Sequence, residues 1–152
     1  MSERVLVAVF ATPVASYLLR YGKDLGYTPV LFEPEGARAT DVEGGFEAVT
    51  TVPELGPDAD VVVTDHNRPE LGAVLKAVLD HPARWVGVLG NPRHAGPHVA
   101  ALKALDVPDP EIARVHRPVG LNIGSRTPPE IAVATLAGLL ADRNGRPGGF
   151  EF

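Results

Sequence analysis

The chain has 152 residues, of which 45% are hydrophobic and 22% charged, and its formal net charge is −5 at pH 7. It has no cysteine, which excludes disulfides, a thiolate nucleophile and cysteine-ligated zinc or iron–sulfur clusters. The negative charge argues against nucleic acid or an anionic membrane as a partner. No stretch has the length of a membrane span or the pattern of a signal peptide, so we expect a cytoplasmic protein without a membrane partner.

The length suits one domain covering residues 1–152. Strand-like and helix-like patterns alternate along it, and valine-rich runs are typical of strands buried on both faces. The expected strands are 5–10, 29–32, 48–52, 60–64, 85–89 and 114–116. Helices are expected from Thr12-Pro13 to about Leu25 and from Asn67 or Arg68 to about Leu79. A third helix should end at Leu105, and Gly96-Pro97 should delay its start or kink it. A fourth helix should follow Thr127. Residues 34–45 are expected to form a loop.

This alternation without hairpins predicts a mainly parallel sheet with right-handed crossovers. The expected fold is therefore a doubly wound α/β domain of the Rossmann type. In such a fold the ligand crevice lies beyond the carboxyl ends of the strands, where the strand order reverses.

The last predicted helix has a well-defined start. Thr127 is a favourable N-cap, Pro128 suits the first helical position, and Glu130 completes a capping box. The run from Ile131 to Ala141 has no charged residue, so most of this helix should be buried. We expect a homodimer contact near it; the alternative is a helix fully covered within one chain.

The segment Pro118–Ile131, together with Ala132-Val133-Ala134, resembles a motif near the end of the XdhC/CoxI family, accessory proteins for molybdenum hydroxylases such as xanthine dehydrogenase. The resemblance covers the Rossmann-like C-terminal domain of that family, and the amino-terminal domain of full-length relatives is missing from this sequence. It implies an accessory or binding protein rather than an enzyme, with a role in binding, maturing or inserting molybdenum cofactor. The implied partner is a molybdenum hydroxylase or a separate chain of the XdhC/CoxI type.

The first turn departs from the dinucleotide-binding pattern. A glycine-rich turn normally follows the first strand and makes room for pyrophosphate, whereas this chain has Phe10-Ala11-Thr12-Pro13. Ala11 and Thr12 remain candidate cofactor-binding positions because a helix N-terminus favours an anion. The absent glycines argue against tight NAD or FAD binding. Glu33 stands where such folds hold a ribose hydroxyl, and an exposed loop carboxylate is the favoured alternative.

Thr64, Asp65 and His66 end the fourth predicted strand and resemble a T-H-D motif of the family with its last two residues reversed. Asp65 and His66 are candidates for an acid–base pair, because imidazole changes charge near neutral pH. Successive side chains often point apart, so structural or solvated roles remain open.

Gly90 and Arg93 follow the next strand and resemble the family's G-x-x-G-S-R-R segment. Arg93 suits a phosphate or a molybdopterin-type anion, which a guanidinium binds with two hydrogen bonds. His94 and His98 have the spacing of a helical metal site. Pro97 lies between them and no third ligand is evident, so no metal site is expected.

The remaining candidates are Asn122, Gly124, Ser125 and Arg126, with Arg93 opposite. Prolines follow Thr127, so a bound phosphate should depend on the amides of residues 124–126 and on the Arg126 guanidinium. A molybdopterin-type cofactor is the first candidate ligand. The alternative is an NAD(P)-dependent oxidoreductase or a nucleotide-binding regulatory module on the same fold.

Overall fold

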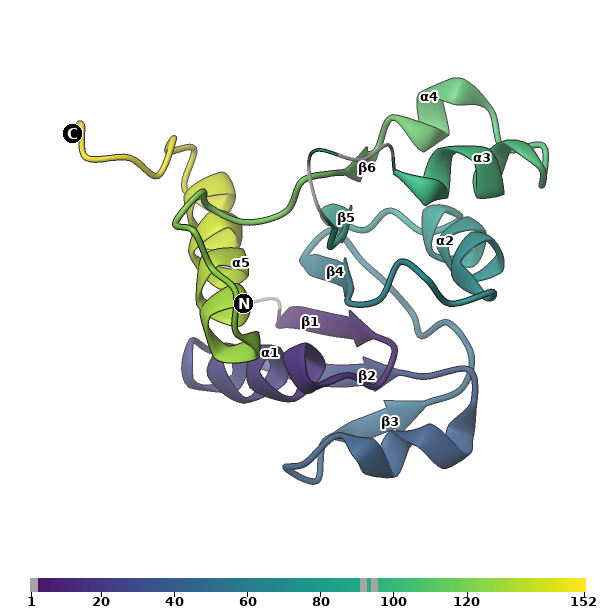
Figure 1. Ribbon diagram of the computed structural model, residues 1–152, viewed down its shortest axis with the longest axis horizontal. Helices are drawn as coiled ribbons and strands as arrows, with labels where there is room; N and C mark the ends of the chain where they lie inside the picture. The colour runs from purple at the N-terminus through teal and green to yellow at the C-terminus, as the bar shows by residue number, and fades with distance from the viewer. Residues whose placement is uncertain (1–2, 91–92, 94–95) are drawn as a thin grey trace.

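A computed structural model describes residues 3–90, 93 and 96–152. Its centre is a six-stranded sheet in the order β3-β2-β1-β4-β5-β6, and every neighbouring pair is parallel (Figure 1). The strands are β1 (Arg4–Val9), β2 (Tyr27–Phe32), β3 (Glu47–Val49), β4 (Ala59–Val63), β5 (Trp85–Val88) and β6 (Val115–His116). The predicted doubly wound, parallel α/β fold is confirmed.

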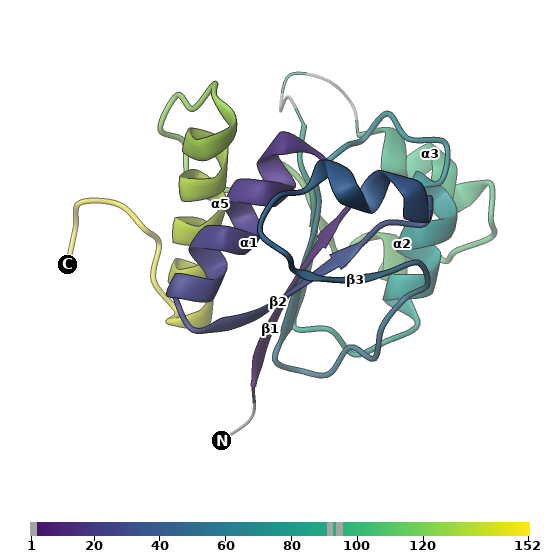
Figure 2. The ribbon, with the colours of Figure 1, turned by 90° about the horizontal axis from the view of Figure 1, so that it is seen from below.

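Helices cover both faces of this sheet. They are α1 (Pro13–Asp24), the 3-10 helix η1 (Gly36–Asp41), α2 (Leu71–Leu79), α3 (Pro97–Lys103), α4 (Asp109–Ile112) and α5 (Pro128–Arg143). Figure 2 shows α1 and α5 together on one face and α2 and α3 on the other. Within the described residues no helix is long and apolar enough to cross a membrane.

The core therefore has two layers, one on each side of the sheet. All five residues of β4 are buried, because alternate side chains enter alternate layers. Val61 and Val63 pack in the layer that includes α2, whereas Val62 packs in the layer that includes α1 and α5. This two-sided burial is the physical reason for the continuous valine run.

The strand registers align the carboxyl ends of the four central strands. Val9 lies opposite both Phe32 and Val63, and Val63 lies opposite Val88. The residues that follow these strands are consequently placed along one edge of the sheet. They are Phe10, Glu33, Thr64 and Leu89.

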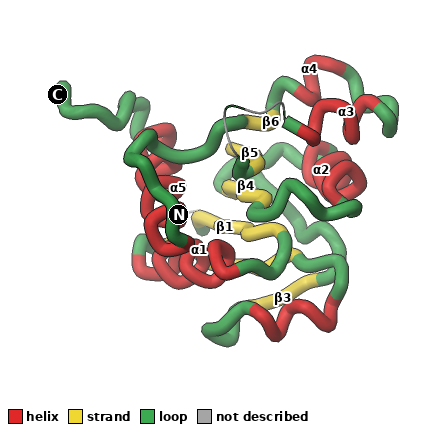
Figure 3. The backbone as a smooth tube through the Cα atoms, in the orientation of Figure 1, coloured by secondary structure: helices red, strands yellow, loops and turns green. Residues whose placement is uncertain are grey.

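Helix α5 begins as predicted, with Thr127 and Glu130 forming the capping box. The chain covers much of this helix itself. It packs against α1, and the Leu121 N–H donates to the Ala134 carbonyl at 3.0 Å. The segment between β6 and α5 thus runs along the helix, as the tube shows (Figure 3). Val133 is 52% exposed, and a homodimer contact there stays a prediction.

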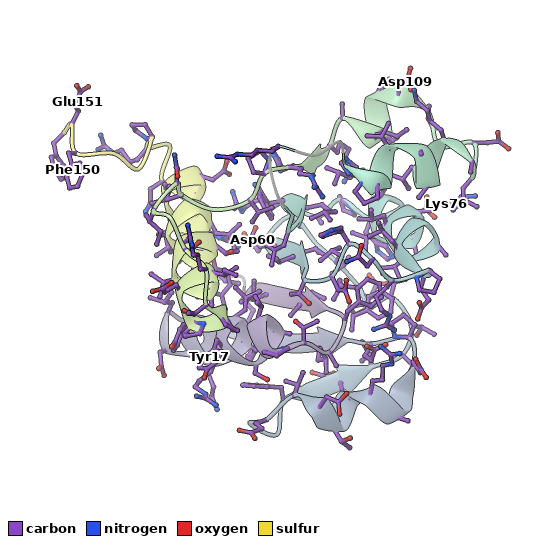
Figure 4. All side chains as sticks on the ribbon, in the orientation of Figure 1. Tyr17, Asp60, Lys76, Asp109, Phe150 and Glu151 are labelled. Carbon is purple, nitrogen blue, oxygen red and sulfur yellow. The ribbon has the colours of Figure 1, made fainter. Side chains whose placement is uncertain are left out.

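A buried carboxylate fixes the other end of α5. Asp60 is fully buried near the start of β4, within the sheet in Figure 4. Its two oxygens accept from Arg84 Nε at 2.7 Å and from Arg143 Nε at 3.0 Å. The Tyr27 hydroxyl donates to it at 3.1 Å. Since Arg143 is the last residue of α5, this cluster fastens that helix to the amino ends of the strands.

Three local predictions differ from the structure. Helix α2 begins at Leu71 rather than at Asn67 or Arg68, because Pro69 disfavours a helical conformation at the residue before it. The loop predicted at 34–45 contains η1, and the short helix α4 was not predicted. The strand expected at 48–52 lies at Glu47–Val49, where pairing with β2 ends. The predicted delay at Gly96-Pro97 is confirmed, since these are the N-cap and first residue of α3.

Candidate functional site

A cavity of about 990 Å³ lies at the carboxyl edge, on the β4–β5 side of β1. It is bounded by the ends of β4 and β5, the first turn of α1, and the segment that leads into α5. Its lining residues are Val14, Thr64, His66, Leu89, Gly90, Arg93, residues 118–126 and Ile131. The strand order reverses between β1 and β4, so this cavity lies where doubly wound folds bind ligands.

Eight of the predicted site residues line this cavity. They are Thr64, His66, Gly90, Arg93, Asn122, Gly124, Ser125 and Arg126. The predicted residues Ala11, Thr12 and Asp65 do not line it. The apolar wall formed by Val14 and Leu89 was not predicted. Its only signal in the sequence is position, since Val14 lies two residues after the N-cap Thr12 and Leu89 directly follows β5.

The charge of the cavity is positive. Arg93 and Arg126 line it with His66, and none of its described lining residues is a carboxylate. Apolar side chains such as Val14, Leu89 and Ile131 make up much of the remaining wall. Guanidinium groups beside an apolar surface can bind the anionic group of a ligand while the wall covers its flat body.

Glu130 controls the end of the loop at Arg126. Its Oε1 accepts from the Arg126 N–H at 3.1 Å and from the Thr127 N–H at 3.3 Å. These hydrogen bonds from the Arg126 and Thr127 amides lower the pKa of Glu130. The Arg126 amide thus has a carboxylate acceptor in this structure, and the expectation that it serves a phosphate stays a prediction. The guanidinium of Arg126 and the amides of residues 124–125 remain as candidate anion donors.

Asp65 and His66 have separate partners. Asp65 Oδ1 accepts from the Asn67 N–H at 2.9 Å, which forms a local turn. His66 Nδ1 lies 3.1 Å from the Leu89 carbonyl oxygen. A carbonyl can only accept, so Nδ1 carries the proton and a neutral His66 has its lone pair on Nε2. The two side chains do not form an acid–base pair with each other in this arrangement.

Thr12 and Ala11 are used within the fold. Thr12 Oγ1 accepts from the Ala15 N–H at 3.1 Å as the N-cap of α1, and it donates to Thr64 Oγ1 at 2.8 Å. The Ala11 N–H donates to Glu33 Oε1 at 3.0 Å. Pro13 has no N–H. The first turn thus commits several of its polar groups to neighbouring residues rather than to an anion.

Glu33 is fully buried rather than an exposed loop carboxylate. Arg68 Nη1 and Nη2 each donate to it at 2.8 Å, in a two-pronged ion pair. Burial alone would raise the pKa of Glu33, but hydrogen bonds from Arg68, Ala11 and Glu35 outweigh it and lower the pKa to about 2. The hydrogen bonds to Glu33 and Glu70 raise the pKa of Arg68. Arg68 was not predicted as a partner, since it lies 35 residues from Glu33.

Three further positions that the sequence singled out are Gly90, which also lines the cavity, and the two histidines His94 and His98. Gly90 makes room for a neighbour, because a Cβ there would collide with the Arg117 guanidinium. His94 lies outside the described residues, and His98 is buried in α3 with 5% exposure. Among the described residues no cluster of three or more potential metal ligands is found.

These features define the class of protein: a Rossmann-type α/β domain with a basic, partly apolar cavity at the reversal of its strand order. The model of the XdhC Rossmann domain matches residues 6–139, and the chain belongs to this family.

The chain is similar to parts of two larger proteins. It is 35% identical over 104 residues to the uncharacterised protein YqeB of Escherichia coli K12. This match covers 68% of this chain and 19% of YqeB. A crystal structure from Bacillus halodurans, described as a xanthine dehydrogenase, superposes with a TM-score of 0.73 at 21% identity. That match covers 94% of this chain and 45% of the other. At such low identity it shows the fold alone.

Proposed function

We propose that this chain is the ligand-holding domain of an accessory protein for a molybdenum hydroxylase such as xanthine dehydrogenase. Membership of the XdhC family supports this proposal. The proposed partner is the hydroxylase or a separate XdhC/CoxI-type chain, as membership of the family suggests. The chain spans less than half the length of each of the two proteins described above.

The proposed ligand is an anionic cofactor of the molybdopterin type. Such a molecule combines a flat heterocycle with a phosphate group, and the cavity offers an apolar wall together with Arg93 and Arg126. The observation that carries the proposal is this basic lining on a chain whose net charge is −5. In this assignment the guanidiniums hold the phosphate, and Val14 and Leu89 cover the heterocycle.

His66 completes the proposed site. Its Nε2 lies on the ring opposite the nitrogen that the Leu89 carbonyl holds, so a neutral His66 can accept a hydrogen bond from a heterocyclic N–H. The described lining residues include no carboxylate, and the nearby Glu130 carboxylate accepts from the Arg126 and Thr127 amides. The molybdenum-containing cofactor supplies its redox chemistry to the client enzyme, and the residues of this chain only bind, orient and shield it.

The test uses neopterin monophosphate, a stable and fluorescent pterin phosphate, titrated into three proteins. The wild type should bind it, and Arg126→Ala should bind at least about tenfold more weakly, the scale of a lost charge-assisted hydrogen bond. The control is Lys76→Ala, which removes an exposed cation on α2, on the opposite face of the sheet (Figure 4). Equal binding by the wild type and Arg126→Ala would contradict this assignment. The melting temperature of each variant should stay close to that of the wild type, because Arg126 is exposed.

A further inference from the structure

The crevice of this fold normally extends across the ends of β1 and β2. In dinucleotide-binding members, pyrophosphate lies at the turn after β1 and a carboxylate at the end of β2 binds a ribose hydroxyl. Glu33 occupies the second of these positions here. The surroundings of Glu33 therefore determine whether a nucleoside fits this half of the crevice.

Both oxygens of Glu33 are already fully engaged. Oε1 accepts from the Ala11 N–H at 3.0 Å and from Arg68 at 2.8 Å. Oε2 accepts from the Glu35 N–H at 2.8 Å and from Arg68 at 2.8 Å. A carboxylate has about four acceptor positions, so these four hydrogen bonds leave none for a ribose hydroxyl.

Arg68 also fills the space above β1. Its guanidinium carbon lies 4.3 Å from the centre of the Phe10 ring, and it forms a second ion pair with Glu70 at 2.7 Å. Arg68 is 8% exposed and Phe10 is fully buried. Phe10 has φ of +75° at the position where the glycine-rich turn begins in dinucleotide-binding relatives of the fold. A buried aromatic ring with a guanidinium stacked on it thus occupies the β1–β2 half of the crevice.

One segment, residues 64–70, contributes side chains both to the cavity on the β4–β5 side and to the filled β1–β2 half of the crevice. Thr64 and His66 line the cavity on the β4–β5 side, whereas Arg68 reaches across β1 to Glu33. The segment is held on the cavity side as well, since Thr64 Oγ1 lies 2.9 Å from the Val9 carbonyl and His66 contacts the Leu89 carbonyl. It therefore divides the crevice into an open half and a closed half.

We propose that the Arg68 side chain occupies the β1–β2 half of the crevice, in the place where a nucleoside would otherwise bind. This domain therefore binds phosphorylated ligands in the open half and offers no site in the closed half to a nucleoside attached to them. The cavity as the anion site rests on the proposed function. The closed half rests only on Glu33, Arg68 and Phe10. The residues present do not fit the dinucleotide that the fold family implies.

The first test measures whether the crevice is closed in solution. Amide hydrogen exchange of Ala11 and Glu35 reports on Glu33, because both amides donate to it. Arg68→Ala should accelerate their exchange at least tenfold relative to the wild type. The control is Arg38→Ala, which removes an exposed ion pair with Glu35 without touching Glu33 and should leave both amides protected. Unchanged exchange in Arg68→Ala would overturn the proposal.

The second test uses the wild type alone, so it does not depend on a variant that folds. Ribose 5-phosphate and ADP-ribose are titrated in parallel, since ADP-ribose contains the smaller molecule joined to a further nucleotide. Affinities within tenfold of each other support the closed half, and ADP-ribose that binds more than tenfold tighter overturns it. If neither ligand binds, the neopterin monophosphate titration decides the anion site of the proposed function, and the exchange of the Ala11 and Glu35 amides decides the closed half.

Discussion

The buried pair of Glu33 and Arg68 should make the protein sensitive to acid. The pKa of Glu33 falls from its ordinary value of 4.5 to about 2 in the folded chain. Each unit of pKa difference between folded and unfolded chains is worth about 1.4 kcal/mol, so this carboxylate contributes about 3 kcal/mol to stability at pH 7. A folded pKa below the unfolded one stabilises the protein above the unfolded pKa. The contribution is therefore lost as the pH falls from about 5 towards 2.

The perturbation is Glu33→Gln, and the assay is urea unfolding of wild type and variant between pH 7 and pH 3. Glutamine keeps the shape of the side chain but removes the charge. The free energy of unfolding should drop by about 3 kcal/mol at pH 7. The difference between the two proteins should shrink to about 1 kcal/mol at pH 3, because the wild-type carboxylate by then contributes little. A difference that stays constant across this range would refute the reasoning.

The matched control for this experiment is Glu35→Gln, two residues away. The Glu35 side chain is 56% exposed and pairs with the exposed Arg38. Exposed ion pairs of this kind contribute about 0–1 kcal/mol, so this variant should follow the wild type at every pH. An equal effect of both variants would show that surface charge, rather than the buried pair, sets the acid sensitivity.

Three further outcomes are expected. Asp60→Ala should lower the free energy of unfolding by about 3–5 kcal/mol in urea titration, because it leaves Arg84 and Arg143 without their buried carboxylate; a loss below about 1 kcal/mol would contradict the cluster's role. Gly120→Ala should cost about 2 kcal/mol or more, since Gly120 has φ of +88° and a Cβ would meet the Ala134 backbone at 3.0 Å. The comparison is Gly56→Ala, where a Cβ meets nothing within 4 Å and the effect should stay near zero. Val133→Glu should convert a homodimer to monomer in sedimentation velocity, and a wild type that is already monomeric at high micromolar concentration would refute that contact.

Local signals in the sequence were sufficient for much of the fold. Thr127 and Glu130 lie three residues apart and reach each other within one turn, so their capping box could be predicted without knowledge of the rest of the chain. The valine run of β4 likewise reports its own burial. By contrast, the ion pair of Glu33 and Arg68 joins residues that are 35 positions apart, so no local pattern in the sequence predicts it.

In the candidate site, too, some features could be predicted from the sequence and others could not. Arg93 and Arg126 could be placed on one cavity because Arg93 follows a strand that ends at the carboxyl edge and Arg126 precedes a helix that begins there. The acceptor of the Arg126 amide could not be predicted, since the Glu130 carboxylate reaches one residue further than the capping box requires. The burial of Glu33 was also unpredictable, because a carboxylate next to Pro34 is ordinarily exposed and only its four donors make burial tolerable.

The two cavity arginines on a chain of net charge −5 give the protein different electrostatic properties at different distances. Salt screens exposed charges beyond about 8 Å at physiological ionic strength. A small anion inside the cavity interacts chiefly with the nearby guanidiniums, whereas an extended polyanion lies against the acidic remainder of the surface and is repelled. Size therefore becomes a selection criterion for anions, and the affinity for a small one should weaken only moderately with added salt, unlike the steep salt dependence of polyanion binding.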